Sequence, residues 1–133
     1  MIPKFRAYSV EENIMYYPDD DKNVEWTIDD DTGFIAPLIN LENGMWRMID
    51  KYVLMQSTGL KDKNGVEIFE GDVLYYIPFE SHINDSIVVF EKGSFCKKML
   101  RNGKLTSVRF IDSEEYEVIG NVYENPELLE VAE

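Results

Sequence analysis

Short apolar runs broken by Gly, Asn and Asp dominate the pattern along this chain. From Val24 to Ile28 apolar and polar residues alternate strictly, as a strand with one solvent-exposed face requires. Lys4 to Tyr8 also alternates, and Ile14 to Tyr17 follows across a short polar stretch, which predicts an N-terminal β-hairpin. The pattern therefore indicates a mainly β fold with several short strands and no long helix.

Two of the three Asn-Gly dipeptides, Asn64-Gly65 and Asn102-Gly103, predict tight hairpin turns, because glycine and asparagine tolerate the positive φ angles that such turns need. The second turn joins two predicted strands, Ser94 to Leu100 and Leu105 to Ile111. Val73 to Ile77 is apolar on both faces, which predicts a central strand or one that is covered on both sides.

Proline and glycine also predict irregularities within the strands. Pro37 lacks an N–H donor, so the strand from Phe34 to Leu41 is predicted to lie at a sheet edge or to contain a bulge. Gly120, inside the strand Tyr116 to Tyr123, predicts a bulge or a close approach of the backbone. Asn125-Pro126 predicts a short C-terminal helical turn, with Asn125 as N-cap and proline at the first helical position.

Composition bounds the size and the partners of the protein. With 133 residues, 44% of them hydrophobic, the chain is long enough for one domain, predicted to span residues 1–133. The formal net charge is −13, from 26 acidic and 13 basic residues. Such a field repels phosphates, so direct binding to nucleic acid is not expected. The simplest interpretation of the acid excess is that it maintains solubility.

The cellular compartment is predicted from the single cysteine and from the absence of membrane signals. Cys96 cannot form an intramolecular disulfide, which fits a reducing cytoplasm. No apolar run follows the basic residues Lys4 and Arg6, and no segment approaches the ~20 apolar residues of a membrane helix. The protein is expected to act inside a cell and away from membranes.

His82 and Cys96 are the residues most capable of catalysis by type. One histidine and one cysteine in different segments exclude a zinc site of the usual kind. His82 could act as a general base, but its polar surroundings favour a solvated loop histidine. Lys97 and Lys98 could activate the Cys96 thiol, yet on a strand Cys96 and Lys97 point to opposite faces, and a buried, inert thiol is the better interpretation.

Acidic and aromatic groups offer further candidates. Asp19 to Asp21 and Asp29 to Gly33 lack the spacing of a calcium-binding hand, and no phosphate-binding glycine loop is present. Glu67 and Glu70 form a weak candidate for an acid–base pair. No catalytic, cofactor-binding or metal-binding residue is therefore predicted. Several aromatic residues could stack on nucleic-acid bases, form subunit interfaces or fill the core, namely Tyr16-Tyr17, Tyr75-Tyr76, Trp26 and Trp46.

Three blocks of sequence together resemble the YopX family of phage and prophage proteins. They are Lys4 to Tyr8, Leu54 to Asp72 and Glu117 to Leu128, which occur in the order of the family and span nearly the whole chain. The family usually has Trp where Tyr8 stands, and residues 18–53 and 78–115 match only loosely.

The resemblance implies a fold and a class of function. It implies a mainly β protein with a small barrel of the SH3 type in its C-terminal half, approximately residues 57–129, self-association, and no established enzymatic activity. The expected function is thus a non-enzymatic accessory protein of a phage or prophage, a homo-oligomeric interaction module in the cytoplasm of the bacterial host. Its partner would be an unknown host or phage protein. The alternative is an acidic nucleic-acid mimic that inhibits a host DNA-binding protein.

Overall fold

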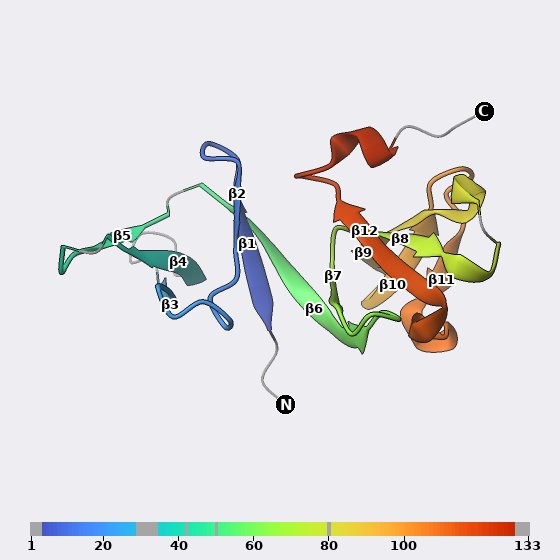
Figure 1. The fold of residues 1–133 in the computed structure, drawn as a ribbon, viewed down its shortest axis with the longest axis horizontal. Helices are drawn as coiled ribbons and strands as arrows, with labels where there is room; N and C mark the ends of the chain where they lie inside the picture. The colour runs from blue at the N-terminus through green and yellow to red at the C-terminus, as the bar shows by residue number, and fades with distance from the viewer. Residues whose placement is uncertain (1–3, 29–34, 42, 50, 80, 130–133) are drawn as a thin grey trace. The chain divides into compact units, whose positions relative to one another are not determined.

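The computed structural model describes residues 4–28, 35–41, 43–49, 51–79 and 81–129. The chain divides into two compact units, Met1–Gln56 and Ser57–Glu133. Within the described residues there are twelve strands and five short 3₁₀ turns, which confirms the mainly β fold (Figure 1). None of the helical turns in this part of the chain has the length and apolar character needed to cross a membrane.

The first unit contains the predicted N-terminal hairpin. β1 (Phe5–Ser9) pairs with β2 (Ile14–Tyr16), which confirms that prediction, and its other edge pairs with the start of β6 (Val53–Lys61). Ala7, Tyr8 and Met55 are buried here. The hairpin is therefore covered by apolar packing on both of its faces, since Ala7 and Tyr8 point in opposite directions.

A three-stranded sheet completes the first unit, in the order β3 (Val24–Ile28), β4 (Ile35–Asn40), β5 (Trp46–Met48). The prediction that Pro37 lies at a sheet edge or a bulge is wrong, because β4 is the middle strand. The Pro37 carbonyl accepts a hydrogen bond from the N–H of Ile49, just beyond the end of β5. The Pro37 nitrogen therefore faces Ile49 at the end of β5, and only the reciprocal hydrogen bond of this last pair is missing.

The second unit is built on a five-stranded antiparallel sheet. Its strand order is β11-β10-β9-β8-β12, and the second half of β6 pairs with β7 (Glu67–Phe69) beside it. The strands of the sheet are β8 (Asp72–Tyr76), β9 (Ser86–Glu91), β10 (Ser94–Met99), β11 (Leu105–Ser107) and β12 (Tyr116–Asn121). As predicted, β8 is an interior strand, and its residues Val73 and Leu74 are both fully buried.

The sheet of the second unit curls into a half-barrel over the segment where the barrel is predicted. β10 and β12 are separated by β9 and β8 in the sheet, yet the Lys97 amine on β10 lies 5.5 Å from the ring centroid of Tyr116 on β12. A flat sheet would hold these strands about three strand spacings apart, roughly 14 Å. The core on the concave side is formed by Ile68, Leu74, Val88 and Tyr116.

One local prediction differs from the structure, and two are confirmed. The strand predicted to run to Ile111 ends at Ser107 and continues as a 3₁₀ turn, η3 (Val108–Phe110). The C-terminal turn η5 (Pro126–Leu129) forms as predicted directly after Asn125, whose carbonyl accepts a hydrogen bond from the N–H of Leu128. The Asn125 side chain accepts a further hydrogen bond from the N–H of Asn121. The register shifts between Val118 and Gly120, which confirms the predicted bulge.

Candidate functional site

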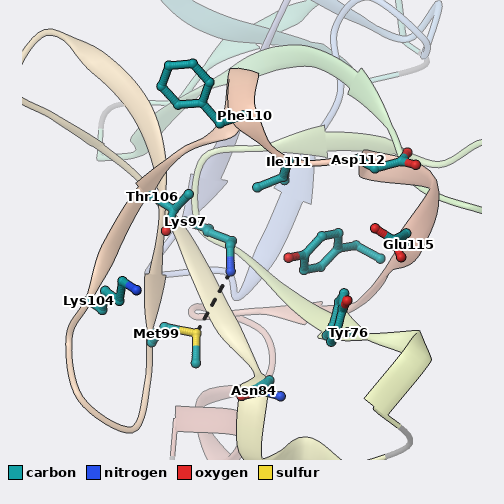
Figure 2. Close-up of a pocket in the computed structure, with 11 residues that line it drawn as sticks. Tyr76, Asn84, Lys97, Met99, Lys104, Thr106, Phe110, Ile111, Asp112 and Glu115 are labelled. Atoms are coloured by element: carbon teal, nitrogen blue, oxygen red, sulfur yellow. Dashed lines mark hydrogen bonds between the residues drawn. The ribbon is translucent and has the colours of Figure 1, made fainter.

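The concave side of the half-barrel holds a pocket of about 400 Å³ (Figure 2). Strands β8, β10, β11 and β12 supply its walls, together with η2 (His82–Asn84) and the segment from Phe110 to Glu115. Its lining combines two tyrosines, Tyr76 and Tyr116, with two lysines and two carboxylates. The pocket is within the size range of small-ligand sites, which begins at about 300 Å³.

Lys97 enters this pocket because of strand register. Lys97 stands opposite Val88 on β9 and opposite Thr106 on β11, so all three side chains lie on the same face of the sheet. Val88 is 1% exposed and belongs to the core, which identifies this face as the concave one. Lys97 thus occupies a position where the fold otherwise places apolar side chains.

The surroundings of the Lys97 amine are mostly apolar. Its nitrogen lies 5.5 Å from the centroid of the Tyr116 ring and 4.0 Å from the sulfur of Met99. Within the described part of the chain, Lys97 forms no ion pair with a carboxylate. Burial lowers the pKa of Lys97, because removal of water disfavours the charged form.

Two tyrosine rings in tilted contact form the apolar wall of the pocket. Tyr76 and Tyr116 face each other across β8 and β12, and their ring centroids are 5.2 Å apart. Burial, and secondarily the charge of Glu115, raise the pKa of Tyr116. The phenol of Tyr116 is therefore protonated at neutral pH and can donate a hydrogen bond.

Glu115 and Asp112 line the side of the pocket away from Lys104 (Figure 2). The Asp112 carboxylate accepts a hydrogen bond from the N–H of Glu114 and caps the short turn η4 (Ser113–Glu115). The pocket therefore has a cationic wall, formed by Lys97 and Lys104, and a separate acidic one.

A second hollow, which we call the aromatic groove, lies on the same unit. It measures about 560 Å³ and is lined by Phe90, Lys92, Phe95, Val108 and Arg109, with Gly93, Ser94 and Ser107. The rings of Phe90 and Phe95 meet edge to face at 5.0 Å, although Phe90 is 50% exposed.

Arg109, which lines the aromatic groove, also contacts Phe110, a residue of the pocket lining. The Arg109 guanidinium lies 5.2 Å from the centroid of the Phe110 ring, and Phe110 is 76% exposed. Exposed aromatic residues with an adjacent arginine are typical of protein-binding surfaces.

The structure places the two candidate catalytic residues apart from both hollows. Cys96 is buried on the face of β10 opposite Lys97, as predicted, and its sulfur lies 3.8 Å from the Ser94 carbonyl oxygen and 3.9 Å from the Ser94 hydroxyl. His82 lies in η2 with its side chain 67% exposed, and its Nδ1 is 2.9 Å from Oδ2 of Asp85. Neither residue lines the pocket or the aromatic groove.

The acidic candidates also serve local structure. The Ser57 hydroxyl donates a hydrogen bond to the carboxylate of Glu67, and neither Glu67 nor Glu70 lines the pocket or the groove. Asp20 lies on an exposed turn and pairs with Lys4 at 3.5 Å. The cluster from Asp29 to Gly33 lies outside the described residues. Among those residues, no three His, Cys, Asp or Glu side chains gather as a metal site would need.

Of the aromatic residues singled out in the sequence, Tyr76 alone lines the pocket. Trp26 packs edge to face on Phe5 at 6.3 Å, and Trp46 is 39% exposed on β5. Sequence reasoning missed Lys97 as a core-facing cation and missed the Phe90–Phe95 pair. The Val88–Lys97 register would have identified the lysine, but it requires knowledge of the strand pairing.

Asp85 is a buried carboxyl group in the second unit whose protonation is coupled to stability. Its residue surface is 6% exposed, and its Oδ1 accepts no hydrogen bond from the described residues. Burial raises the pKa of Asp85, and the hydrogen bond from His82 opposes that effect. The folded state therefore retains this proton to a higher pH than the unfolded chain does, so stability is lost as pH rises from the ordinary carboxyl range through the raised pKa.

Asp85→Asn is accordingly expected to raise the free energy of unfolding relative to the wild type near neutral pH, and this advantage should shrink as pH falls below the ordinary carboxyl range. Urea unfolding at a series of pH values measures it. Asp112→Asn, at an exposed carboxylate, is the control. A difference between Asp85→Asn and wild type that does not change with pH would contradict the expectation.

The fold and the two hollows define a mainly β protein whose second unit is a half-barrel with a lysine on its concave face. A sequence model of the YopX protein family matches residues 4–130, and this chain belongs to that family.

Two solved structures share the architecture. Protein EF1440 from Enterococcus faecalis is 36% identical and has a TM-score of 0.65, with 98% of this chain and 99% of that chain covered. The protein yopX from Bacillus subtilis is 24% identical with a TM-score of 0.70, over the full length of both chains. No curated protein matches this chain.

Proposed function

We propose that this protein is a non-enzymatic interaction module that assembles with copies of itself through the aromatic groove. The exposed Phe90 ring, packed on Phe95 beside Arg109, is the observation that carries the proposal. Half of the Phe90 surface remains in water, and association would remove it from water at a gain of about 25 cal/mol per Å².

Charge favours a second copy of this chain as the occupant of the groove. Lys92 and Arg109 place two exposed cations on it, whereas the chain as a whole carries a net charge of −13. An acidic surface of another copy would therefore be attracted to the groove, and the aromatic rings would supply the apolar contact. The family resemblance supports a phage or prophage protein that acts in the cytoplasm of the bacterial host, where an unidentified host or phage protein would be the further partner.

Phe90→Ser is expected to shift the protein from an oligomer to the monomer at micromolar concentration, because it removes an exposed ring that lines the groove. Light scattering coupled to size exclusion measures the mass. Phe79→Ser is the matched control, since Phe79 is 58% exposed on η1 (Ile77–Phe79) and does not line the groove. The control should keep the wild-type mass.

Arg109→Glu tests the electrostatic part of the same interface, and we expect it to weaken association as strongly as Phe90→Ser does. A wild-type protein that is strictly monomeric at micromolar concentration would overturn the proposal. An oligomer that persists in both variants would also overturn the assignment to the aromatic groove.

A further inference from the structure

Lys97 is a cation on the apolar face of a small half-barrel, and such a position is unfavourable for folding. The amine faces the Tyr116 ring and the Met99 sulfur, and no carboxylate of the described residues pairs with it. Lys97 is half-buried, and partial removal of water from an unpaired charge opposes folding, whereas an apolar side chain at the same position would pack with Val88. Residues that break the packing rule in this way concentrate at functional sites.

The pocket supplies further groups that suit an anionic ligand. The Thr106 side chain stands next to Lys97 across the β10–β11 ladder, and Lys104 lines the same side of the pocket (Figure 2). An anion beside Lys97 would gain a charge-assisted hydrogen bond from the half-buried amine.

The remaining lining residues favour a ligand that carries a planar apolar group. Tyr76, Tyr116, Met99 and Ile111 line the pocket, and the two tyrosine rings are 5.2 Å apart in a tilted arrangement. Asp112 and Glu115 lie on the opposite side of the pocket from Lys104 (Figure 2). These two carboxylates would repel an anionic group, which would therefore bind on the side of the lysines.

We propose that this pocket is a binding site for a small aromatic carboxylate, whose carboxylate pairs with the Lys97 amine while its ring packs against Tyr76 and Tyr116. The volume of about 400 Å³ accommodates a single ring with its substituents. This site is separate from the aromatic groove, since Lys97 does not line that groove, and the proposal does not depend on self-association.

The probes are benzoate and its neutral isostere benzamide, titrated into the full chain near neutral pH and followed by NMR chemical shifts. We expect benzoate to bind with a Kd of about 1 mM, as a ligand of so few atoms allows, and benzamide to bind at least ~10-fold more weakly. Lys97→Met should abolish the preference for benzoate. It should also leave Tm unchanged or raise it by about 3 °C, because methionine suits the concave face.

Lys98→Met is the matched control, because Lys98 is the next residue on β10, points to the other face and pairs with Glu91 at 3.9 Å. It should keep the benzoate affinity within about twofold. Lys104→Met, at the exposed rim, should weaken benzoate binding without any loss of fold, so the test stands even if Lys97→Met does not fold.

The titrations with the two probes have outcomes that either support or overturn the site. Preference for benzoate that disappears in Lys97→Met and survives in Lys98→Met supports the site. Equal binding of the two probes, or no binding of either at about 10 mM, would overturn it. A preference for benzoate that survives in Lys97→Met would also overturn it, because the carboxylate would then pair elsewhere.

Discussion

Asp62→Ala is expected to lower the free energy of unfolding by about 3 kcal/mol or more. Asp62 is buried, with 4% of its residue surface exposed. Its carboxylate accepts three backbone hydrogen bonds, from the N–H groups of Asn64, Val66 and Val118, at 2.8, 2.9 and 2.9 Å. Two of these bonds hold the turn at Asn64-Gly65, and the third connects that turn to β12. Alanine would leave all three donors without their acceptor.

Urea denaturation with a fluorescence or circular dichroism readout measures this loss. Asp112→Ala is the control, because its exposed carboxylate accepts one backbone hydrogen bond, from Glu114 at 3.1 Å, and it should lose only about 1 kcal/mol. Equal losses of unfolding free energy in the two variants would contradict the expected stabilisation by the three hydrogen bonds to Asp62.

Gly120→Ala is expected to lower the free energy of unfolding by about 2 kcal/mol or more, because the added methyl group would clash with neighbouring side chains. A Cβ atom at Gly120 would lie 2.5 Å from Oδ1 of Asn125 and 2.7 Å from Cδ1 of Leu128. Asn125 cannot move freely, since the same oxygen accepts the hydrogen bond from Asn121 at 3.2 Å. The C-terminal turn would therefore be pushed away from the bulge in β12.

Gly103→Ala separates this clash from the backbone cost of replacing glycine. Gly103 has a φ of +71°, but the nearest atom to a Cβ there is Cε of Lys98 at 3.9 Å, so only the conformational cost of about 1 kcal/mol remains. Adding Leu128→Ala to Gly120→Ala should recover part of the loss. Equal losses for the two glycine variants, measured by thermal unfolding, would contradict the proposed clash.

Asp62 and Gly120 lie in two of the blocks that carry the resemblance to the YopX family. The hydrogen bond from Val118 to Asp62 directly joins these blocks, 56 residues apart in the chain. Both residues stabilise the half-barrel, and neither lines the pocket. These blocks therefore contribute to the fold, whereas the candidate ligand site is built largely from the segment 78–115, which lies outside the three blocks.

Part of the acidic composition is buried and does not contribute to the surface charge. Asp62, Asp72 and Asp85 are buried in the second unit, and Asp72 accepts a hydrogen bond from the N–H of Phe69 at 2.8 Å. These carboxylates serve the fold and do not add to an acidic surface. A nucleic-acid mimic would have to rely on the remaining exposed acids.

The sequence by itself determined the mainly β class, the N-terminal hairpin, the interior position of β8 and the bulge at Gly120. These features depend on alternation and on the conformational limits of glycine and asparagine, which are properties of neighbouring residues. The burial of Cys96 was expected from its residue type, because a free cysteine is usually buried, and alternation placed it on the face opposite Lys97.

Only the tertiary structure decided the place of Pro37 and the role of Lys97. Pro37 is tolerated in a middle strand because β5 ends beside it, and no local pattern records the length of a neighbouring strand. Lys97 faces the core because its register partner is Val88, and it reaches Tyr116 because the sheet curls. Strand pairing and sheet curvature arise from contacts between residues far apart in sequence, which is why a local pattern predicts the strands but not the pocket they enclose.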